Sequence, residues 1–389
     1  MPIPFDYETL RFIWWALLGV LLIGLAVMDG FDMGAAFLNP FIGRTDEEHR
    51  TVLNTVGPVW EGNQVWLITG GGAIFAAFPI VYAAAFSGFY VAMLLVLLSL
   101  ILRPVSFEFR NKFPRDKRFI LDGTLFLSGL VPPLVFGVAF GNLFQGVPFT
   151  LDDMAAVHYV PGAGYAGWLG GFFGLLNPFG LLCGLVSVAM LAAHGGVYVA
   201  VKTDGVLRQR ATIAALIFIS LWAVLFAVGG LWVGNIEGYM VSGALAHDGP
   251  SNPVLKHVVR ASGAWLANYR DHPYLYGVPL LAFLSAFMAA IQLRAGRFGT
   301  AFVCSGLMVG CTIATAGISL FPFLMPSSLN PAHSLTVWDA TSSRMTLWLM
   351  TLAAAVFVPV VIAYTSWVFR VLRGPVTTAH VTANSDHLY

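Results

Sequence analysis

The sequence predicts an all-α polytopic membrane protein, and three observations point to that fold class. Of the 389 residues, 58% are hydrophobic and only 10% are charged, whereas roughly a quarter of an average soluble chain is charged. The apolar residues fall into segments of about 20, the length that a helix needs to cross the hydrocarbon core of a bilayer.

A net charge of +1 argues against a nucleic-acid partner, because no basic field is available to neutralise phosphates.

Nine segments are expected to cross the membrane. They span residues 12–33, 59–78, 80–102, 119–140, 172–201, 213–233, 274–293, 301–325 and 345–372. Pro79 separates the second from the third, because proline cannot continue a helix. The first segment is expected to stay in the protein, since its leader carries Asp6 and Glu8 and no small-residue cleavage site follows. We expect one membrane-embedded helical domain over residues 1–373 and a disordered cytoplasmic tail over residues 374–389.

The basic residues predict the orientation of the chain. When the connections are assigned alternately to the two sides, one side receives 15 Lys and Arg residues and the other receives 5. The richer side takes Arg44, Arg50, Arg103, Arg110, Lys112, Arg115, Lys117, Arg118, Lys202, Arg208, Arg210, Arg294, Arg297, Arg370 and Arg373. The other side takes Arg11, Lys256, Arg260, Arg270 and Arg344. Because basic loops stay in the cytoplasm, the C-terminus is expected to be cytoplasmic and the N-terminus periplasmic.

Three acidic residues within the predicted spans need an explanation. Asp29 and Asp32 lie late in the first span, and Glu61 lies at the start of the second. A charged carboxylate near the bilayer centre costs about 2.5 to 3.5 kcal/mol on insertion scales, so such a group is usually paired, hydrated or protonated. The topology brings all three toward the cytoplasmic third of the membrane. Since burial lets a carboxyl group exchange protons near neutral pH, we interpret Asp29 and Glu61 as a cytoplasmic proton path.

Polar and aromatic residues around Glu61 are expected to support this path. The supporting polar or channel residues are Trp60, Asn63, Gln64, Trp66 and Arg103. Arg103 closes the third span and is expected to pair with Glu61 or Glu108, with a snorkelling cation in the basic loop as the alternative. The glycines that follow this polar strip, at positions 70–72, are interpreted as a site of close helix packing.

Each acid also has a structural interpretation. Asp29 or Asp32 could cap or bend the first helix at Gly30 and Gly34, and Glu61 could be an interfacial acid stabilised by the helix dipole. We favour the structural role for Asp32 and the functional role for Asp29 and Glu61.

Metal and haem ligands are scarce in the predicted spans. His194 is the one histidine inside a span, and we interpret it as a hydrogen-bonded residue at a helix interface, because a haem in a bundle needs axial ligands at facing depths. Cys183, Cys304 and Cys311 all fall in apolar runs without a C-x-x-C pair, so we expect packing roles. The sequence therefore predicts no metal site and no catalytic residue on this chain.

Eight sequence stretches resemble subunit II of the cytochrome bd quinol oxidase family over almost the whole chain. They are residues 6–15 (DYETLRFIWW), 28–34 (MDGFDMG), 60–69 (WEGNQVWLIT), 82–91 (YAAAFSGFYV), 141–149 (GNLFQGVPF), 176–180 (LNPFG), 321–328 (FPFLMPSS) and 335–343 (LTVWDATSS). Together these stretches are highly specific, although each one alone would be weak.

The resemblance implies a heterodimer in the bacterial inner membrane. Its larger subunit I would carry two b haems and haem d, oxidise quinol and reduce dioxygen to water, and so generate proton motive force. This chain would support subunit I and contribute a proton path through acids matching Asp29 and Glu61, with an oxygen route past Trp66 in some members. Some members also hold a structural quinone or a small accessory membrane subunit. Many relatives have Asp at the position of Glu61, so this chain keeps the acid with one more methylene of reach.

Two other functions remain open from the residues alone. A proton-coupled secondary transporter also places acids in glycine-rich spans, but it would act without a haem-bearing partner. A purely structural assembly subunit would need Asp29 and Glu61 only for the yield of a complex.

Overall fold

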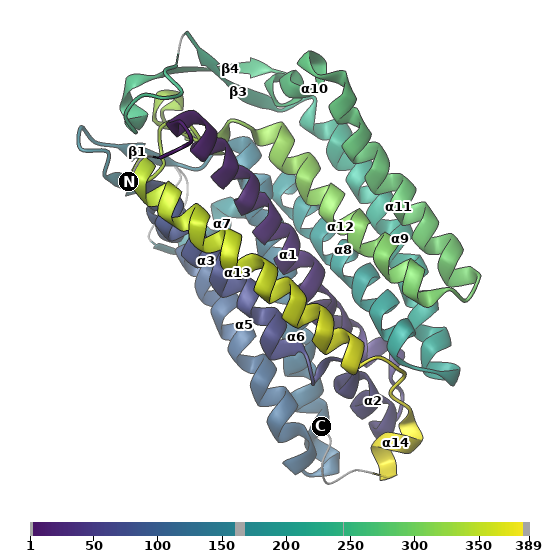
Figure 1. The fold of residues 1–389 in the computed structure, drawn as a ribbon. Coiled ribbons are helices and arrows are strands. Elements are labelled where there is room, and N and C mark those ends of the chain that lie inside the picture. Colours follow the sequence, from purple (N-terminus) through teal and green to yellow (C-terminus); the bar gives the residue numbers. More distant parts are fainter. Residues whose placement is uncertain (1–2, 160–167, 244, 384–389) are drawn as a thin grey trace.

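The computed structural model describes residues 3–159, 168–243 and 245–383, and it is an elongated bundle of long helices with short strands at one end (Figure 1). The helices are α1 (Tyr7–Ile42), α2 (Asp46–Val56), α3 (Trp60–Ala77), α4 (Pro79–Gly88), α5 (Tyr90–Phe109), α6 (Arg118–Gln145), α7 (Trp168–Leu175), α8 (Pro178–Lys202), α9 (Gly205–Val233), α10 (Ala267–Asp271), α11 (Gly277–Arg294), α12 (Phe298–Leu320), α13 (Arg344–Val371) and α14 (Thr378–Ala383). The strands are β1 (Phe149–Leu151), β2 (Val157–Tyr159), β3 (Glu237–Ser242), β4 (His257–Ser262), β5 (Phe323–Met325) and β6 (Leu335–Thr336).

The described part of the chain contains eight helices that are long and apolar enough to cross a membrane. They correspond to every predicted span except the one at residues 59–78, which coincides with the 18-residue helix α3. The polar residues in the first turns of α3 lower the mean hydropathy of this helix. The polytopic helical fold is therefore confirmed, and the count of nine spans stays a prediction.

The predicted span at residues 80–102 is wrong as one helix. The chain breaks at Phe89, so that α4 is a separate short helix and the long helix starts at Tyr90. A Cβ atom on Gly88 would lie 2.7 Å from the ring of Tyr159, which shows that β2 packs against the break. This contact comes from 71 residues further along the chain, and apolar character alone gives no sign of it. Pro79, by contrast, separates α3 from α4 as predicted.

Two further predicted spans have different limits in the structure. The span predicted at residues 172–201 contains a second break, because Asn177 caps α8 by accepting a hydrogen bond from the backbone N–H of Gly180. Pro178 then occupies the first turn of α8, where its missing N–H costs nothing. The span predicted at residues 301–325 ends as a helix at Leu320, and the chain continues into β5.

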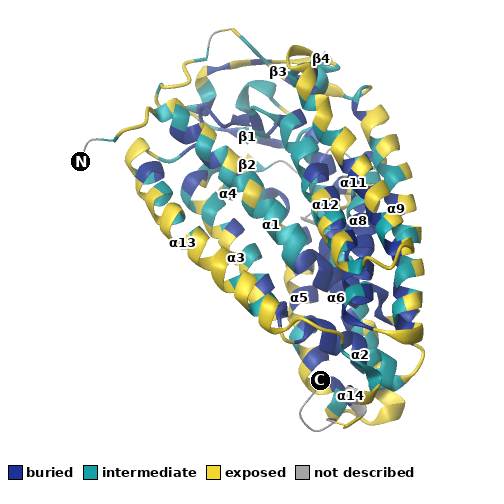
Figure 2. Cartoon of the chain, turned by 45° about the vertical axis from the view of Figure 1, so that its right-hand side comes forward, coloured by how far each residue is buried: buried dark blue, intermediate teal, exposed yellow. Residues whose placement is uncertain are grey.

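The core of the bundle forms where α1 crosses α8. A Cβ atom on Gly34 would lie 2.0 Å from the backbone oxygen of Leu191, so the two backbones touch, as small residues allow in membrane bundles. Buried residues gather around α8, whereas α13 is exposed along most of its length (Figure 2). Cβ atoms added to the glycines at positions 70–72 would have no described neighbour within 4 Å, although Gly70 itself is buried. Their interpretation as a site of close helix packing stays a prediction.

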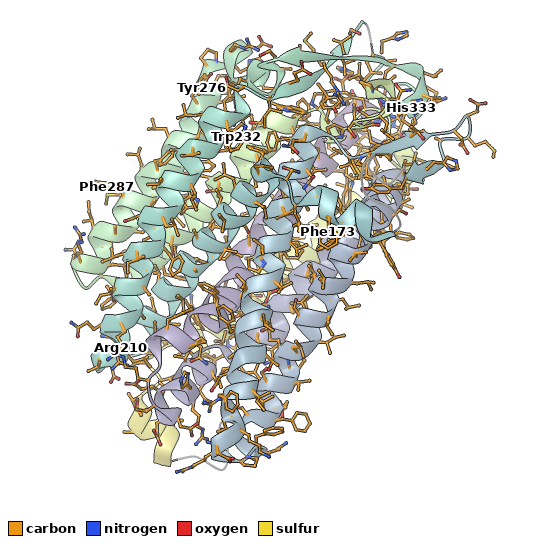
Figure 3. The ribbon with its side chains drawn as sticks, turned by 180° about the vertical axis from the view of Figure 1, so that it is seen from behind. Phe173, Arg210, Trp232, Tyr276, Phe287 and His333 are labelled. Atoms are coloured by element: carbon orange, nitrogen blue, oxygen red, sulfur yellow. The ribbon has the colours of Figure 1, made fainter. Side chains whose placement is uncertain are left out.

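The two ends of the bundle differ in structure. One end, where α1 begins, carries the antiparallel pairs β1–β2, β3–β4 and β5–β6 (Figure 1). The opposite end, where α13 finishes, carries α2 and α14. Arg210 lies at this α2 end, whereas Tyr276 and His333 lie at the strand end (Figure 3). The sequence predicts disorder after Gly374, but α14 packs there against α2, with Val381 only 1% exposed.

Candidate functional site

Asp29 and Asp32 lie on one face of α1 and are buried inside the bundle. Their exposed fractions are 0% and 2%, and the helix continues past both to Ile42. Neither residue caps or ends the helix, so the capping role is wrong for both, whereas a bend of α1 at Gly30 or Gly34 stays a prediction. The i,i+3 spacing instead places the two carboxylates on one side of α1, where Asp32 contacts α3 and Asp29 contacts α5.

Asp29 forms a buried ion pair with Arg103 of α5. The Nη1 atom of Arg103 lies 2.5 Å from Oδ1 of Asp29, and the two side chains are 1% and 0% exposed. The prediction that Arg103 pairs with Glu61 or Glu108 is therefore wrong. Oδ2 of Asp29 and both Nε and Nη2 of Arg103 have no hydrogen-bond partner among the described residues. Because buried polar atoms normally have partners, this pair is suited to contact water or a group from another molecule.

Asp32 is bonded to the first turn of α3. Its Oδ2 atom accepts a hydrogen bond of 2.8 Å from the Nδ2 atom of Asn63, whereas its Oδ1 atom has no partner among the described residues. The structure thus brings α1, α3 and α5 together around four buried polar side chains. We call these four residues, Asp29, Asp32, Asn63 and Arg103, the acid cluster.

Glu61 lies near the acid cluster in sequence but on the outer side of α3. Its side chain is exposed, and no described residue forms a hydrogen bond or ion pair with it. Asn63, only two residues later, is 3% exposed and belongs to the cluster. The first turn of α3 therefore joins an accessible carboxyl group to a buried polar site.

The other predicted supporting residues pack around this turn. The ring of Trp60 stacks on Phe107 at 5.5 Å between ring centroids, and the two planes are 5° from parallel. Trp66 packs onto α1 where Gly24 leaves room, because a Cβ atom there would lie 2.4 Å from the Trp66 ring. Gln64 is half-buried and forms no hydrogen bond with the described residues. Trp60 and Trp66 therefore pack against neighbouring helices, and no hydrogen bond joins either of them to a described residue of the acid cluster.

His194 is engaged through both ring nitrogens. Nδ1 lies 2.8 Å from the hydroxyl of Ser305, and Nε2 lies 3.0 Å from the backbone oxygen of Val27. The ring also stacks on Phe302 at 4.8 Å. The interpretation as a hydrogen-bonded interface histidine is confirmed. Ligation of a haem iron by His194 would cost one of these contacts, so this residue does not fit the role of an axial ligand.

Charged residues at the α2 end tie the helices together. Arg110 binds Asp46 at 3.0 Å and Asp122 at 2.7 Å, and Arg118 also pairs with Asp46. Glu48 of α2 accepts a hydrogen bond of 2.7 Å from Arg210 of α9. These pairs connect α2 to α9, to α6 and to the connection between α5 and α6. None of them includes a residue of the acid cluster.

A second buried ion pair, at the strand end, was missed by the sequence reasoning. Lys256 lies 2.9 Å from Asp339, and the two side chains are 1% and 2% exposed. Burial lowers the pKa of Lys256, an effect that Asp339 opposes. The signal available in sequence was Asp339 itself, an acid in the stretch at residues 335–343, but no spacing rule connects it to Lys256.

A family model described as cytochrome bd terminal oxidase subunit II matches residues 10–372 of this chain. Among curated proteins, cytochrome bd-I ubiquinol oxidase subunit 2 of Escherichia coli K12 is 49% identical over 386 residues, which cover 99% of this chain and 100% of that protein. The probable cytochrome oxidase subunit 2 of Haemophilus influenzae is 47% identical over 385 residues.

Among solved structures, a chain of the bd oxidase from Geobacillus thermodenitrificans matches with a TM-score of 0.66. The match covers 94% of this chain and 99% of that one at 19% sequence identity, so it supports the fold alone. The sequence relatives and the family model confirm the resemblance inferred from the motifs.

Proposed function

Because the chain belongs to the cytochrome bd terminal oxidase subunit II family, we propose that it works beside a haem-bearing subunit I in the bacterial inner membrane. Two b haems and haem d would be ligated by subunit I, which oxidises quinol and reduces dioxygen to water. This chain would supply a proton path from the cytoplasm. The buried acid cluster behind the accessible Glu61 is the observation that carries the proposal.

The path follows contacts in the first turn of α3. Protons enter at Glu61 and pass Asn63, which is bonded to Asp32 at 2.8 Å. Asp32 stands one helical turn from Asp29, whose pair with Arg103 leaves one carboxylate oxygen and two guanidinium nitrogens without partners among the described residues. Atoms of this kind can exchange hydrogen bonds with water during transfer. Asp32 therefore joins Asp29 and Glu61 in the proposed path.

Nine crossings fit the arrangement of the bundle. The chain starts α1 at the strand end and finishes α13 at the α2 end, which requires an odd number of crossings (Figure 1). Eight long helices and α3 together meet that requirement. With the basic residues gathered in the connections of the α2 end, that end faces the cytoplasm and the N-terminus faces the periplasm.

The exposed face of α3 is the docking face that we propose for subunit I. Val65, Ile68 and Phe75 are 51%, 71% and 60% exposed, and Glu61 continues this face toward the α2 end. Glycines at positions 70–72 leave room for a close neighbour. A face that ends in a carboxyl group is unfavourable against lipid, whereas a protein partner can cover its apolar residues and leave Glu61 at the cytoplasmic edge.

The test of this function is the optical spectrum of the purified protein. The account predicts that this chain co-purifies with a second subunit and that the complex shows b-type and d-type haem absorbance, which the isolated chain lacks. Proton-coupled transport by the chain alone, without a haem-bearing partner, would contradict the account and favour the transporter.

A further inference from the structure

Five basic residues lie in or next to the short connection between α5 and α6 at the α2 end. Two of them form ion pairs within the protein, and three are exposed. The connection contains two 3-10 turns, η1 (Arg110–Lys112) and η2 (Arg115–Lys117). Arg110 is buried and Arg118 is partly buried, and both form ion pairs with Asp46, with Arg110 also bound to Asp122. These two cations therefore stabilise the fold and are not free to bind a ligand.

The other three cations, Lys112, Arg115 and Lys117, are exposed and form no ion pair with any described residue. Two exposed acids, Glu108 and Asp116, share this surface and are likewise unpaired within the described chain. The five groups together carry one net positive charge. That balance suits a single phosphate group better than a polyanion, because a polyanion is attracted by an extended field of one sign.

Exposed aromatic residues frame these cations. Phe109, Phe113 and Phe119 are 50%, 37% and 70% exposed, and the ammonium of Lys112 lies 5.3 Å from the centroid of the Phe109 ring. The connection joins the candidate spans Tyr90–Lys112 and Arg115–Gln145, so it lies where two helices leave the hydrocarbon region. Aromatic and basic side chains at that depth are the usual contacts of lipid headgroups.

We propose that this connection binds an anionic phospholipid. Lys112, Arg115 and Lys117 contact the phosphate of the headgroup, and Phe109, Phe113 and Phe119 insert among the upper acyl carbons. Charge complementarity and membrane depth together select a lipid over a free phosphate ion, which would leave the aromatic rings uncovered. The inference needs only that α5 and α6 cross the membrane, and it does not depend on the proton path.

The test compares two double variants of the purified two-subunit complex. Lys112→Gln/Lys117→Gln removes two cations from the site, whereas the control Arg294→Gln/Arg297→Gln removes two exposed cations from the turn between α11 and α12, at the same end of the bundle. That turn offers no exposed aromatic residue. Each complex is equilibrated with equal amounts of phosphatidylglycerol and phosphatidylcholine, and native mass spectrometry measures the lipids that remain bound.

We expect the wild type and the control to retain phosphatidylglycerol in preference to phosphatidylcholine. The Lys112/Lys117 variant loses about 30-fold in apparent affinity for phosphatidylglycerol, since each cation near an anionic lipid surface contributes about 1 kcal/mol. Equal loss in both variants would mean diffuse surface attraction and would overturn the proposal. So would unchanged retention in the Lys112/Lys117 variant, or loss of subunit I without loss of lipid, which would identify the connection as a protein contact.

Discussion

Arg103 and Asp29 illustrate how much a single buried charge depends on its partner. The pair is 1% and 0% exposed, and taking one partner away leaves the other charge in an apolar environment. Removing one member of such a pair typically costs about 3 to 5 kcal/mol, whereas removing both together costs far less. The stability of this region therefore depends on the pair as a unit.

We predict that Arg103→Met strongly lowers the thermal midpoint of the purified complex, and that Asp29→Asn/Arg103→Met recovers a large part of the loss. The double variant leaves neither member of this pair as a buried charge without its partner, which is the physical reason for the recovery. Thermal unfolding followed by intrinsic fluorescence measures both effects. If Arg103→Met kept the wild-type thermal midpoint, the stability of the complex would not depend on the ion pair between Asp29 and Arg103.

Residue types could be predicted from sequence here, but their partners could not. Asp29, Glu61, Asn63 and Arg103 all stand out as polar residues in apolar segments, and three of them meet in the acid cluster. The sequence predicts Glu61 or Glu108 as the partner of Arg103, because those residues are near it along the chain or at the same depth. The rotation of α5 against α1 decides the actual partner, and that rotation follows from packing over the whole bundle.

At the scale of elements, the crossing of α1 and α8 depends on glycine. A Cβ atom on Gly34 would collide with the backbone of Leu191, whereas one on Gly19 of the same helix would meet nothing within 4 Å. Alanine also favours a helix by about 1 kcal/mol over glycine in solution. The two positions therefore respond in opposite directions to the same substitution.

We predict that Gly34→Ala lowers the yield and the thermal midpoint of the complex, because α1 and α8 must separate. Gly19→Ala serves as the matched control and should leave both unchanged or slightly raised. Size-exclusion chromatography and thermal unfolding measure the two quantities. Comparable behaviour of the two variants would mean that the backbone contact at Gly34 does not hold the helices together.

The strand end contains a histidine whose protonation opposes folding. Nδ1 of His333 accepts a hydrogen bond of 2.9 Å from the backbone N–H of Leu151, which joins the turn at residues 331–333 to β1. Burial, with a smaller effect from the nearby Lys256, lowers the pKa of His333 below its ordinary value of 6.5. The unfolded chain therefore binds this proton at a higher pH than the folded one, and stability falls as the pH drops below 6.5.

We predict that the thermal midpoint of the wild type falls more between pH 7 and pH 5 than that of His333→Asn. Asparagine keeps an acceptor for the Leu151 N–H but does not titrate. Unfolding curves at several pH values measure the difference between the two slopes. Parallel slopes would exclude His333 from the pH response.

Helix limits were predictable where a local signal exists and not elsewhere. Pro79 marks the end of α3, and Asn177 with Pro178 forms a capping sequence that could have divided the span predicted at residues 172–201. The break at Phe89 has no comparable local signal, since β2 packs there through Tyr159. Contacts of this kind become visible only with the tertiary fold.

On the scale of the whole molecule, the account assigns different neighbours to different faces. The outer face of α3 should meet subunit I, whereas α11 presents an apolar face suited to lipid, with Phe287 pointing outward and 63% exposed (Figure 3). A bulky residue should therefore be harmful on one face and harmless on the other.

We predict that Ile68→Trp on α3 lowers the amount of subunit I that co-purifies with this chain, because the larger ring separates two packed helices. Phe287→Trp on α11 should have no such effect, since a lipid-facing position tolerates a larger apolar ring. Quantifying both subunits after affinity purification measures the outcome. Full recovery of subunit I with Ile68→Trp would place the interface elsewhere.

The proton path through Glu61 and Asp29 is the central claim, and quinol oxidase turnover per haem tests it most directly. Asp29→Asn and Glu61→Gln should each lower turnover by about tenfold or more, because a proton carrier in series limits every cycle. Glu108→Gln, the same change at an exposed acid outside the cluster, should keep wild-type turnover. Wild-type turnover in both Asp29→Asn and Glu61→Gln, at unchanged haem content, would contradict the account.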